Sequence, residues 1–179
     1  LGAVAHVAAF HLRVRGTTLI ETFRAAQPLL EEALRGAAAC DDRTARAEFD
    51  DALSGFSRPG LGVSERVLLQ EESELISAIL ALAGNSAIEL MIQILYEFGL
   101  RQTSERIFAD RPDRIQEWMV ARDRLAAAIR DGDAEMAVLL GRRRRDVMEA
   151  WLESDFDATG HSAVATHDAE SGRPQRGDP

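Results

Sequence analysis

The feature that most constrains the fold is a pair of amphipathic segments joined by a tight corner, within residues 122–137. The first segment ends in Ala-Ala-Ala-Ile-Arg, and the corner that follows is Asp131-Gly132-Asp133. Gly132 suits the left-handed residue that follows a helix end, and the Asp133 carboxylate can cap the next helix. Small and apolar side chains recur on one side of each segment. The pattern therefore predicts a helical hairpin.

Start and stop signals for helices recur along the rest of the chain, and we find no convincing strand. Thr18 and Glu21 stand at the spacing of a capping box. Ser86 and Glu89 repeat that spacing, and Pro112 suits a first helical position. The expected helices cover roughly 18–39, 42–53, 64–82, 86–98, 111–130 and 133–152, with a charged helix or turn over 103–109. The sequence predicts an all-α fold, an antiparallel helical bundle of about six to seven helices.

Three segments depart from the ordinary amphipathic pattern. Residues 1–15 have neither clean strand nor clean helix periodicity. Pro28 lies inside the first expected helix, where it should bend the helix or mark a junction between two helices. The helix from Ser86 to Phe98 is apolar on nearly every side, which indicates burial at the centre of the bundle or at a subunit interface.

Composition narrows the classes of protein to which the chain can belong. The 179 residues carry a net charge of −9, so the chain as given should be repelled by nucleic acid. No run approaches the roughly 18 apolar residues that a membrane span needs. A single cysteine, Cys40, fits a reducing compartment. Because Leu1 is not methionine and no signal-peptide pattern follows it, we expect a cytoplasmic fragment of a longer protein.

Three motifs occur in the order and spacing of one known family. The hairpin contains Ala-Ile-x-x-Gly-Asp-x-x-x-Ala, residues 128–137, and residues 82–85 read Leu-Ala-Gly-Asn. Residues 21–28 read Glu-x-x-Arg-Ala-Ala-Gln-Pro. These segments resemble the last hairpin, the end of the central helix (Ala-Ser-Gly-Asn) and the opening helix (Arg-x-x-Glu-Pro) of the FCD domain. That domain is the effector-binding half of many GntR-type bacterial transcription regulators. Gln27 replaces the usual Glu.

The resemblance implies a division of the chain into three parts. Residues 1–16 would be the linker from a missing N-terminal winged-helix domain, through which alone the protein would bind DNA. Residues 17–153 would form an FCD-like domain that binds a ligand and forms a homodimer without catalysing a reaction. Residues 154–179 are poor in apolar side chains, and their composition predicts a disordered tail.

Many FCD domains hold a metal ion with one Asp and three His. By alignment with the motifs above, those ligand positions fall here on Glu72, Ile76, Arg122 and Arg144. One ligand is therefore conservatively changed, from Asp to Glu72, and the other three are lost, since neither isoleucine nor a protonated guanidinium has a lone pair to offer a cation. The four histidines lie near the termini, outside the helices that would build the site. We predict no metal and no other cofactor.

Two interpretations of these arginines remain open. Arg122 and Arg144, from facing antiparallel helices, could bind a small metabolite bearing a carboxylate or phosphate, with Ile76 as an apolar wall. Alternatively, Arg122 pairs with Glu72, and Arg144 belongs to a solvated run of four arginines, residues 142–145. In either case helical geometry allows only one residue of that run to point inward.

Arg24 matches the arginine of the family's opening helix and could reach the same pocket, although a surface position or an ion pair with Glu72 is an equal alternative. Two other classes of function also remain. A helical enzyme could use Glu72 with Arg122 and Arg144 for acid–base chemistry, and a ligand-free interaction module would use only the helical surface. We favour the effector-binding domain, because no Ser/His/Asp or Cys/His set falls within the expected helices.

Overall fold

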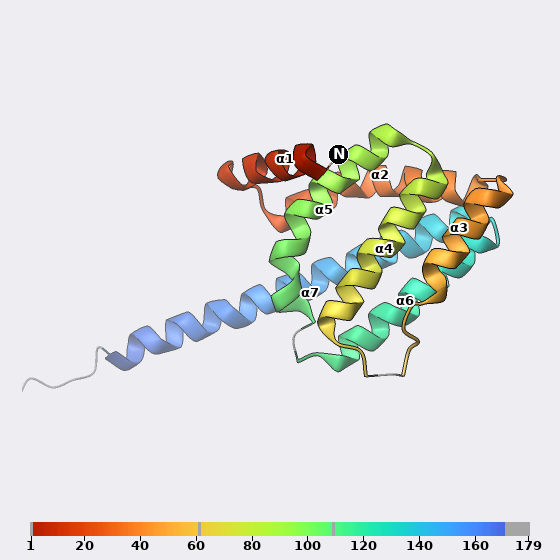
Figure 1. Ribbon diagram of the computed structural model, residues 1–179. Helices are drawn as coiled ribbons and strands as arrows, with labels where there is room; N and C mark the ends of the chain where they lie inside the picture. Colours follow the sequence, from red (N-terminus) through yellow and green to blue (C-terminus); the bar gives the residue numbers. More distant parts are fainter. Residues whose placement is uncertain (1, 61, 109, 171–179) are drawn as a thin grey trace, which may run out of the picture.

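The computed structural model describes the backbone of residues 2–60, 62–108 and 110–170 (Figure 1). This part of the chain contains helices and no strand, so the prediction of an all-α bundle is confirmed. The seven helices are α1 (Gly2–Val14), α2 (Leu19–Ala39), α3 (Arg43–Ser54), α4 (Glu65–Ala83), α5 (Ser86–Ile107), α6 (Pro112–Arg130) and α7 (Ala134–Glu170). None of the helices in the described residues is long and apolar enough to cross a membrane.

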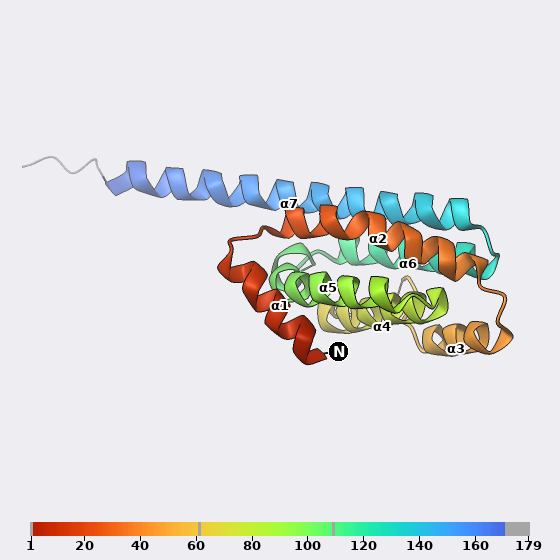
Figure 2. The same ribbon diagram turned by 90° about the horizontal axis from the view of Figure 1, so that it is seen from above.

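Helix α2 is central to the bundle, because it contacts α4, α5, α6 and α7. Helices α2 and α7 lie side by side over the length of α2, and α6 folds back along α7 (Figures 1 and 2). Helices α3 and α4 pack on each other at the opposite side, and α1 lies across α5 (Figure 2). Five helices, α2, α4, α5, α6 and α7, therefore surround the middle of the molecule.

The helix ends follow the sequence signals closely at three places. The Thr18 hydroxyl accepts from the Glu21 amide while the Glu21 carboxylate accepts from the Thr18 amide at 2.7 Å, which is the predicted capping box. Gly132 has a φ of 72°, and the Asp133 carboxylate accepts from the amide of Met136 at 2.9 Å. The hairpin of α6 and α7 is therefore confirmed in detail.

Helix α1 corrects our reading of residues 1–15, which are helical from Gly2 to Val14 rather than irregular. Ala9 of α1 is fully buried, and Leu12 lines a hollow together with Ile94 of α5. Packing against another helix stabilises a segment whose own periodicity is weak, because tertiary contacts supply most of the stability of a short helix. Whether residues 1–16 also serve as a linker stays a prediction.

Helix α2 passes through Pro28 as one helix, which excludes a junction between two helices at that point. Helix α5 is also continuous to Ile107, so the separate element expected over 103–109 is wrong. Phe98 and Ile107 are both fully buried, and these two apolar anchors hold the intervening residues in one helix. The cap of α5 is Asn85 instead of the predicted Ser86, since its carboxamide accepts from the amides of the second and third residues that follow it.

Helix α7 continues to Glu170, beyond the end near residue 152 that we expected, and its last turns extend past the bundle (Figure 2). Residues 154–170 are therefore helical where composition predicted a disordered tail. No proline interrupts this stretch, and adding residues to an existing helix avoids the cost of nucleation. The remainder of the predicted tail, residues 171–179, lies outside the described residues.

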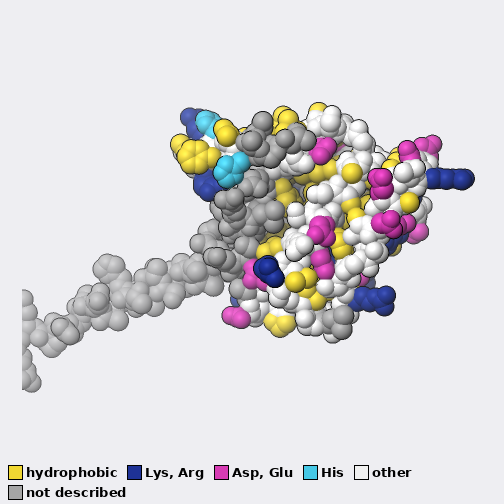
Figure 3. Space-filling view, in the orientation of Figure 1, with side chains coloured by type: hydrophobic (Ala, Val, Ile, Leu, Met, Phe, Trp, Pro, Cys, Tyr) yellow, Lys and Arg dark blue, Asp and Glu magenta, His cyan; other side chains and the backbone are white. Residues whose placement is uncertain are grey.

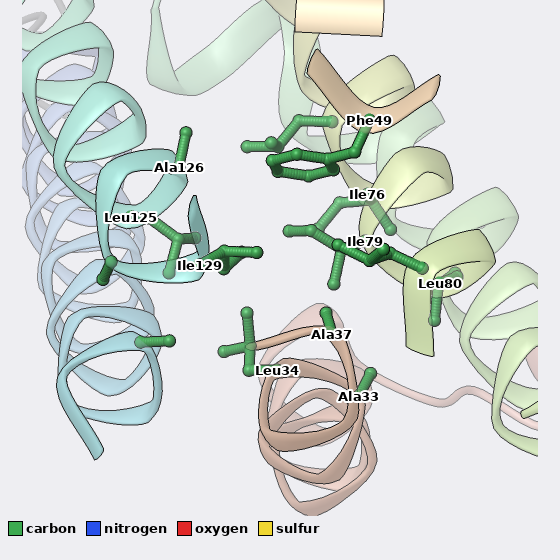
Figure 4. Close-up of a cluster of buried hydrophobic side chains, with 14 of the residues drawn as sticks. Ala33, Leu34, Ala37, Phe49, Ile76, Ile79, Leu80, Leu125, Ala126 and Ile129 are labelled. Atoms are coloured by element: carbon green, nitrogen blue, oxygen red, sulfur yellow. The ribbon is translucent and has the colours of Figure 1, made fainter. Parts of the chain in front are cut away.

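The main hydrophobic core lies between α2, α3, α4 and α6 (Figure 4). Leu34 of α2, Ile79 of α4 and Ile129 of α6 meet there and are completely buried. A second apolar cluster surrounds Trp118 and includes Leu68 and Met119. The candidate site contacts both clusters, so its side chains are held by packed surroundings on each side.

Candidate functional site

A cavity of about 130 Å³ lies within the bundle and is lined by side chains of α2, α4, α5, α6 and α7. Most of its wall is apolar, and Ile76 forms part of that wall as the sequence predicted. The polar side chains that reach it include Gln27, Glu72, Tyr96 and Arg144. An apolar hollow with a few converging polar groups has the form of a small-molecule site.

A buried ion pair forms the polar end of this cavity. Arg144 Nη2 donates to Glu72 Oε2 at 2.6 Å, and Trp118 Nε1 donates to the same oxygen at 3.0 Å. The guanidinium carbon of Arg144 lies 4.2 Å from the centre of the Trp118 ring, within cation–π range. Arg144 and Glu72 are each only 7% exposed, so this is a fixed, desolvated group of charges.

Arg144 is not fully satisfied by these contacts. Its Nε is buried and has no hydrogen-bond partner within the described part of the chain. A buried donor left without an acceptor costs free energy, on the order of 1–3 kcal/mol. The arginine therefore has one N–H available for an acceptor that enters the cavity it lines.

Arg122 occupies a different place from the one we expected. It is 1% exposed, yet it does not line the cavity. Its Nη1 donates to Glu71 at 2.5 Å, its Nη2 to the backbone carbonyl of Ser57, and its Nε to Asp123 at 3.1 Å. Because all three nitrogens already have acceptors, Arg122 fixes the loop before α4 against α4 and α6 and is not available to a ligand.

The predicted pairing of Arg122 with Glu72 is therefore wrong by one residue. Glu71 takes Arg122, and the adjacent Glu72 takes Arg144. Successive residues of a helix differ in direction by about 100°, so the two carboxylates of α4 face different neighbours. The sequence signal was present in the pair of acidic residues itself, but their choice of partner depends on the rotation of α4 in the bundle.

Arg24 also departs from the expected site. Its side chain is 62% exposed and lies 3.8 Å from Glu149 of α7. In the structure Arg24 lies at the surface, because its position on α2 faces the edge of α7 instead of the cavity. Arg24 therefore does not belong to the candidate site.

The run of arginines at 142–145 behaves as helical geometry predicts. Arg144 is the buried member, and Arg143 is exposed. Arg142 forms two hydrogen bonds with Glu31 of α2, at 2.8 and 2.6 Å. The hydrogen bonds from Arg142, with a smaller contribution from Gln27, lower the pKa of Glu31 to about 2. Arg144 is the buried cation of the cavity, and the neighbouring Arg145, whose side chain is 29% exposed, also lines it.

Tyr96 and Trp118 are two further site residues, which the sequence motifs did not indicate. Both line the cavity, and Trp118 also hydrogen-bonds Glu72. Burial, followed by the negative charge of Glu72, raises the pKa of Tyr96 well above its usual value, so its hydroxyl stays protonated and can donate. Their polar atoms on otherwise apolar helix faces were the only available signal.

Among the described residues, no three His, Cys, Asp or Glu side chains gather closely enough to hold a metal ion. The absence of a metal in the purified protein stays a prediction. A scan against protein-family models found no match, and neither did searches of curated proteins and of solved structures.

Proposed function

We propose that this chain is the effector-binding and dimerisation domain of a GntR-type transcription regulator, which acts in the cytoplasm and binds a small anionic metabolite without a metal. The observation that carries the proposal is Arg144, which lines the cavity and whose buried Nε has no acceptor among the described residues. A carboxylate oxygen placed there would form the charge-assisted hydrogen bond that is missing. The order of the three sequence motifs supports the assignment to this family.

Size and charge narrow the class of ligand. An engineered apolar cavity of about 150 Å³ holds benzene, so a hollow of about 130 Å³ suits an apolar body of similar size. Glu72 already brings one negative charge beside Arg144, and a dianion would meet stronger repulsion than a monoanion. A small monocarboxylate therefore fits better than a phosphate. The protonated hydroxyl of Tyr96 is a second donor at the same wall.

Regulation would follow from the position of the cavity. Five helices line it, so a ligand that fills it favours one packing of these helices over others. In a GntR-type regulator that difference in packing would change the placement of an N-terminal DNA-binding domain, which is not part of this chain. We propose no catalysis, because Glu72 is already committed to two donors.

For dimerisation we propose a surface other than α5, the helix that the sequence placed either at the centre of the bundle or at a subunit interface. The apolar helix α5 is covered by α1 and α2 within the chain, which accounts for much of its composition. Val7, Phe10 and Val14 instead form an exposed stripe along α1, one helical face spaced at three and four residues. Figure 3 shows apolar, histidine and arginine side chains gathered on this helix. We propose that a second copy of the chain covers this stripe.

The effector site is tested by melting the protein with 4-fluorobenzoate and with its neutral isostere 4-fluorobenzamide. At 100 times the dissociation constant, a ligand adds about 2.7 kcal/mol of stability, which raises the melting temperature of a chain of this size by about 5–10 °C. We expect that rise with the carboxylate and little with the amide.

The matched variant is Arg144→Met combined with Glu72→Gln, which removes both buried charges together and avoids an unpaired one. It should abolish the rise, whereas Arg43→Ala, at an exposed position on α3, should retain it. Equal rises with the carboxylate and the amide, or a rise that survives in the double variant, would contradict the proposal.

A further inference from the structure

A second hollow, of about 400 Å³, lies between α6 and α7 on the outside of the bundle. We call it the α6/α7 groove, and define it by Trp118, Ala121 and Arg124 of α6 with Arg143 and Arg144 of α7. The other residues along it include Leu140 and Val147, which make its floor mainly apolar.

The wall between the α6/α7 groove and the internal cavity is one side chain thick at two places. Trp118 and Arg144 line both hollows, so each of them has the cavity on one side and the groove on the other. The two side chains stack on each other, and both are hydrogen-bonded to Glu72. A rotation of the long Arg144 side chain away from Trp118 would join the two hollows, at the cost of the hydrogen bond to Glu72.

The charge on the groove is opposite to that of the whole chain. The chain carries a net charge of −9, yet the lining of the groove includes the exposed Arg124 and Arg143 and one carboxylate, Glu117. The charge of Arg144, which also lines the groove, is paired with Glu72. A cationic cleft with an apolar floor raises the local concentration of small anions and accelerates their association.

We propose that the α6/α7 groove is the entrance to the internal cavity, with the stack of Arg144 on Trp118 as its door and with Arg124 and Arg143 as charges that attract an anionic ligand. This inference rests on the proposed function, since it concerns the route to the same cavity. The door links the two roles of Arg144, because the side chain that closes the route is also the one that receives the ligand.

The route is tested by measuring association and dissociation rate constants of 4-fluorobenzoate from ¹⁹F line shapes. Ala121→Phe narrows the groove, and Ala121 does not line the cavity. A narrower entrance slows entry and exit by the same factor, so we expect kon and koff to fall together, about fivefold or more, with Kd unchanged. Ala81→Phe is the matched control, because Ala81 lines a separate groove between α3 and α4.

A second pair of variants tests the charges without adding volume. Reversing Arg124 and Arg143 to Glu should lower kon about tenfold at low salt and leave koff unchanged, since steering acts on encounter. Reversing Arg43 and Arg58, exposed residues elsewhere, changes the net charge by the same amount and should lower kon much less.

Three results would contradict the proposal that the α6/α7 groove is the entrance to the cavity. Rate constants of Ala121→Phe equal to those of Ala81→Phe would place the route elsewhere, as would equal losses of kon in the two charge-reversed proteins. In both cases the ligand still binds the wild-type protein, so the proposed function stands. If 4-fluorobenzoate does not bind the wild-type protein at all, the effector site fails and the entrance fails with it.

Discussion

Replacing Arg122 with methionine should destabilise the fold by about 3 kcal/mol while leaving ligand binding intact. Arg122 is almost completely buried, and it bridges Glu71 of α4, Asp123 of α6 and the carbonyl of Ser57. Methionine keeps the apolar stem but removes every donor. The change leaves the Glu71 carboxylate buried without its counter-charge and the Ser57 carbonyl without this donor.

The magnitude follows from what remains around Glu71. Removing one partner of a buried ion pair costs about 3–5 kcal/mol. The amide and hydroxyl of Ser57 still donate to Glu71 Oε1, at 2.7 and 2.6 Å. Because the carboxylate keeps these two hydrogen bonds, the lower end of the range of about 3–5 kcal/mol applies. For a chain of this length the melting temperature should fall by about 6–12 °C. Adding Glu71→Gln removes the unpaired charge and should restore about half of the loss.

Urea unfolding of the wild-type, single and double variants measures these differences, and titration with 4-fluorobenzoate follows the cavity. The dissociation constant should change less than threefold, because Arg122 does not line the cavity. A loss of stability under about 1 kcal/mol would contradict the role of Arg122 as a buried ion-pair partner that stabilises the fold. A tenfold loss of affinity for 4-fluorobenzoate at unchanged stability would instead show that Arg122 belongs to the ligand site.

Three further predictions concern other parts of the molecule. Hydrogen bonds from Arg142 lower the pKa of Glu31 from 4.5 to about 2, so its stabilising effect is complete above pH 4.5 and disappears as the pH falls to 2. Glu31→Gln should therefore lower the urea midpoint at pH 7 but not near pH 2. Gly141→Ala should cost about 1–2 kcal/mol, because its Cβ would meet a methyl group of α2 at 2.5 Å, whereas Gly55→Ala has free space and should change stability by less than 1 kcal/mol. Sedimentation should show a dimer that Phe10→Glu converts to a monomer; a monomeric wild-type protein would contradict the proposed interface.

Local signals along the chain were sufficient for most of the fold. The capping box at Thr18 and the corner at Gly132 depend on residues a few positions apart, and both were predictable. Helix α1 was not, because its own periodicity is weak, and contact with α5 decides its form. The end of α7 was missed for a related reason, since composition alone does not show that a helix already formed will continue.

The sequence was sufficient to predict which positions meet at the site, but not which residues pair with each other there. Glu72, Ile76 and Arg144 do meet at one cavity. Which carboxylate takes which arginine depends on the rotation of α4 relative to α6 and α7, and a change of one residue is enough to exchange Glu71 for Glu72. Arg24 was misplaced for the same reason, because its direction around α2 is fixed only when α7 is in place.

We propose that Arg144 Nε, which has no hydrogen-bond partner among the described residues, receives the acid group of a small ligand inside the bundle. A crystal structure of the protein with 4-bromobenzoate tests it directly, because anomalous scattering from bromine locates the ring and the density orients the carboxylate. We expect bromine inside the cavity and a carboxylate oxygen within about 3 Å of Arg144 Nε, with the pair of Arg144 and Glu72 retained. An empty cavity at saturating ligand, or a carboxylate that points away from Arg144, would contradict this role of Arg144.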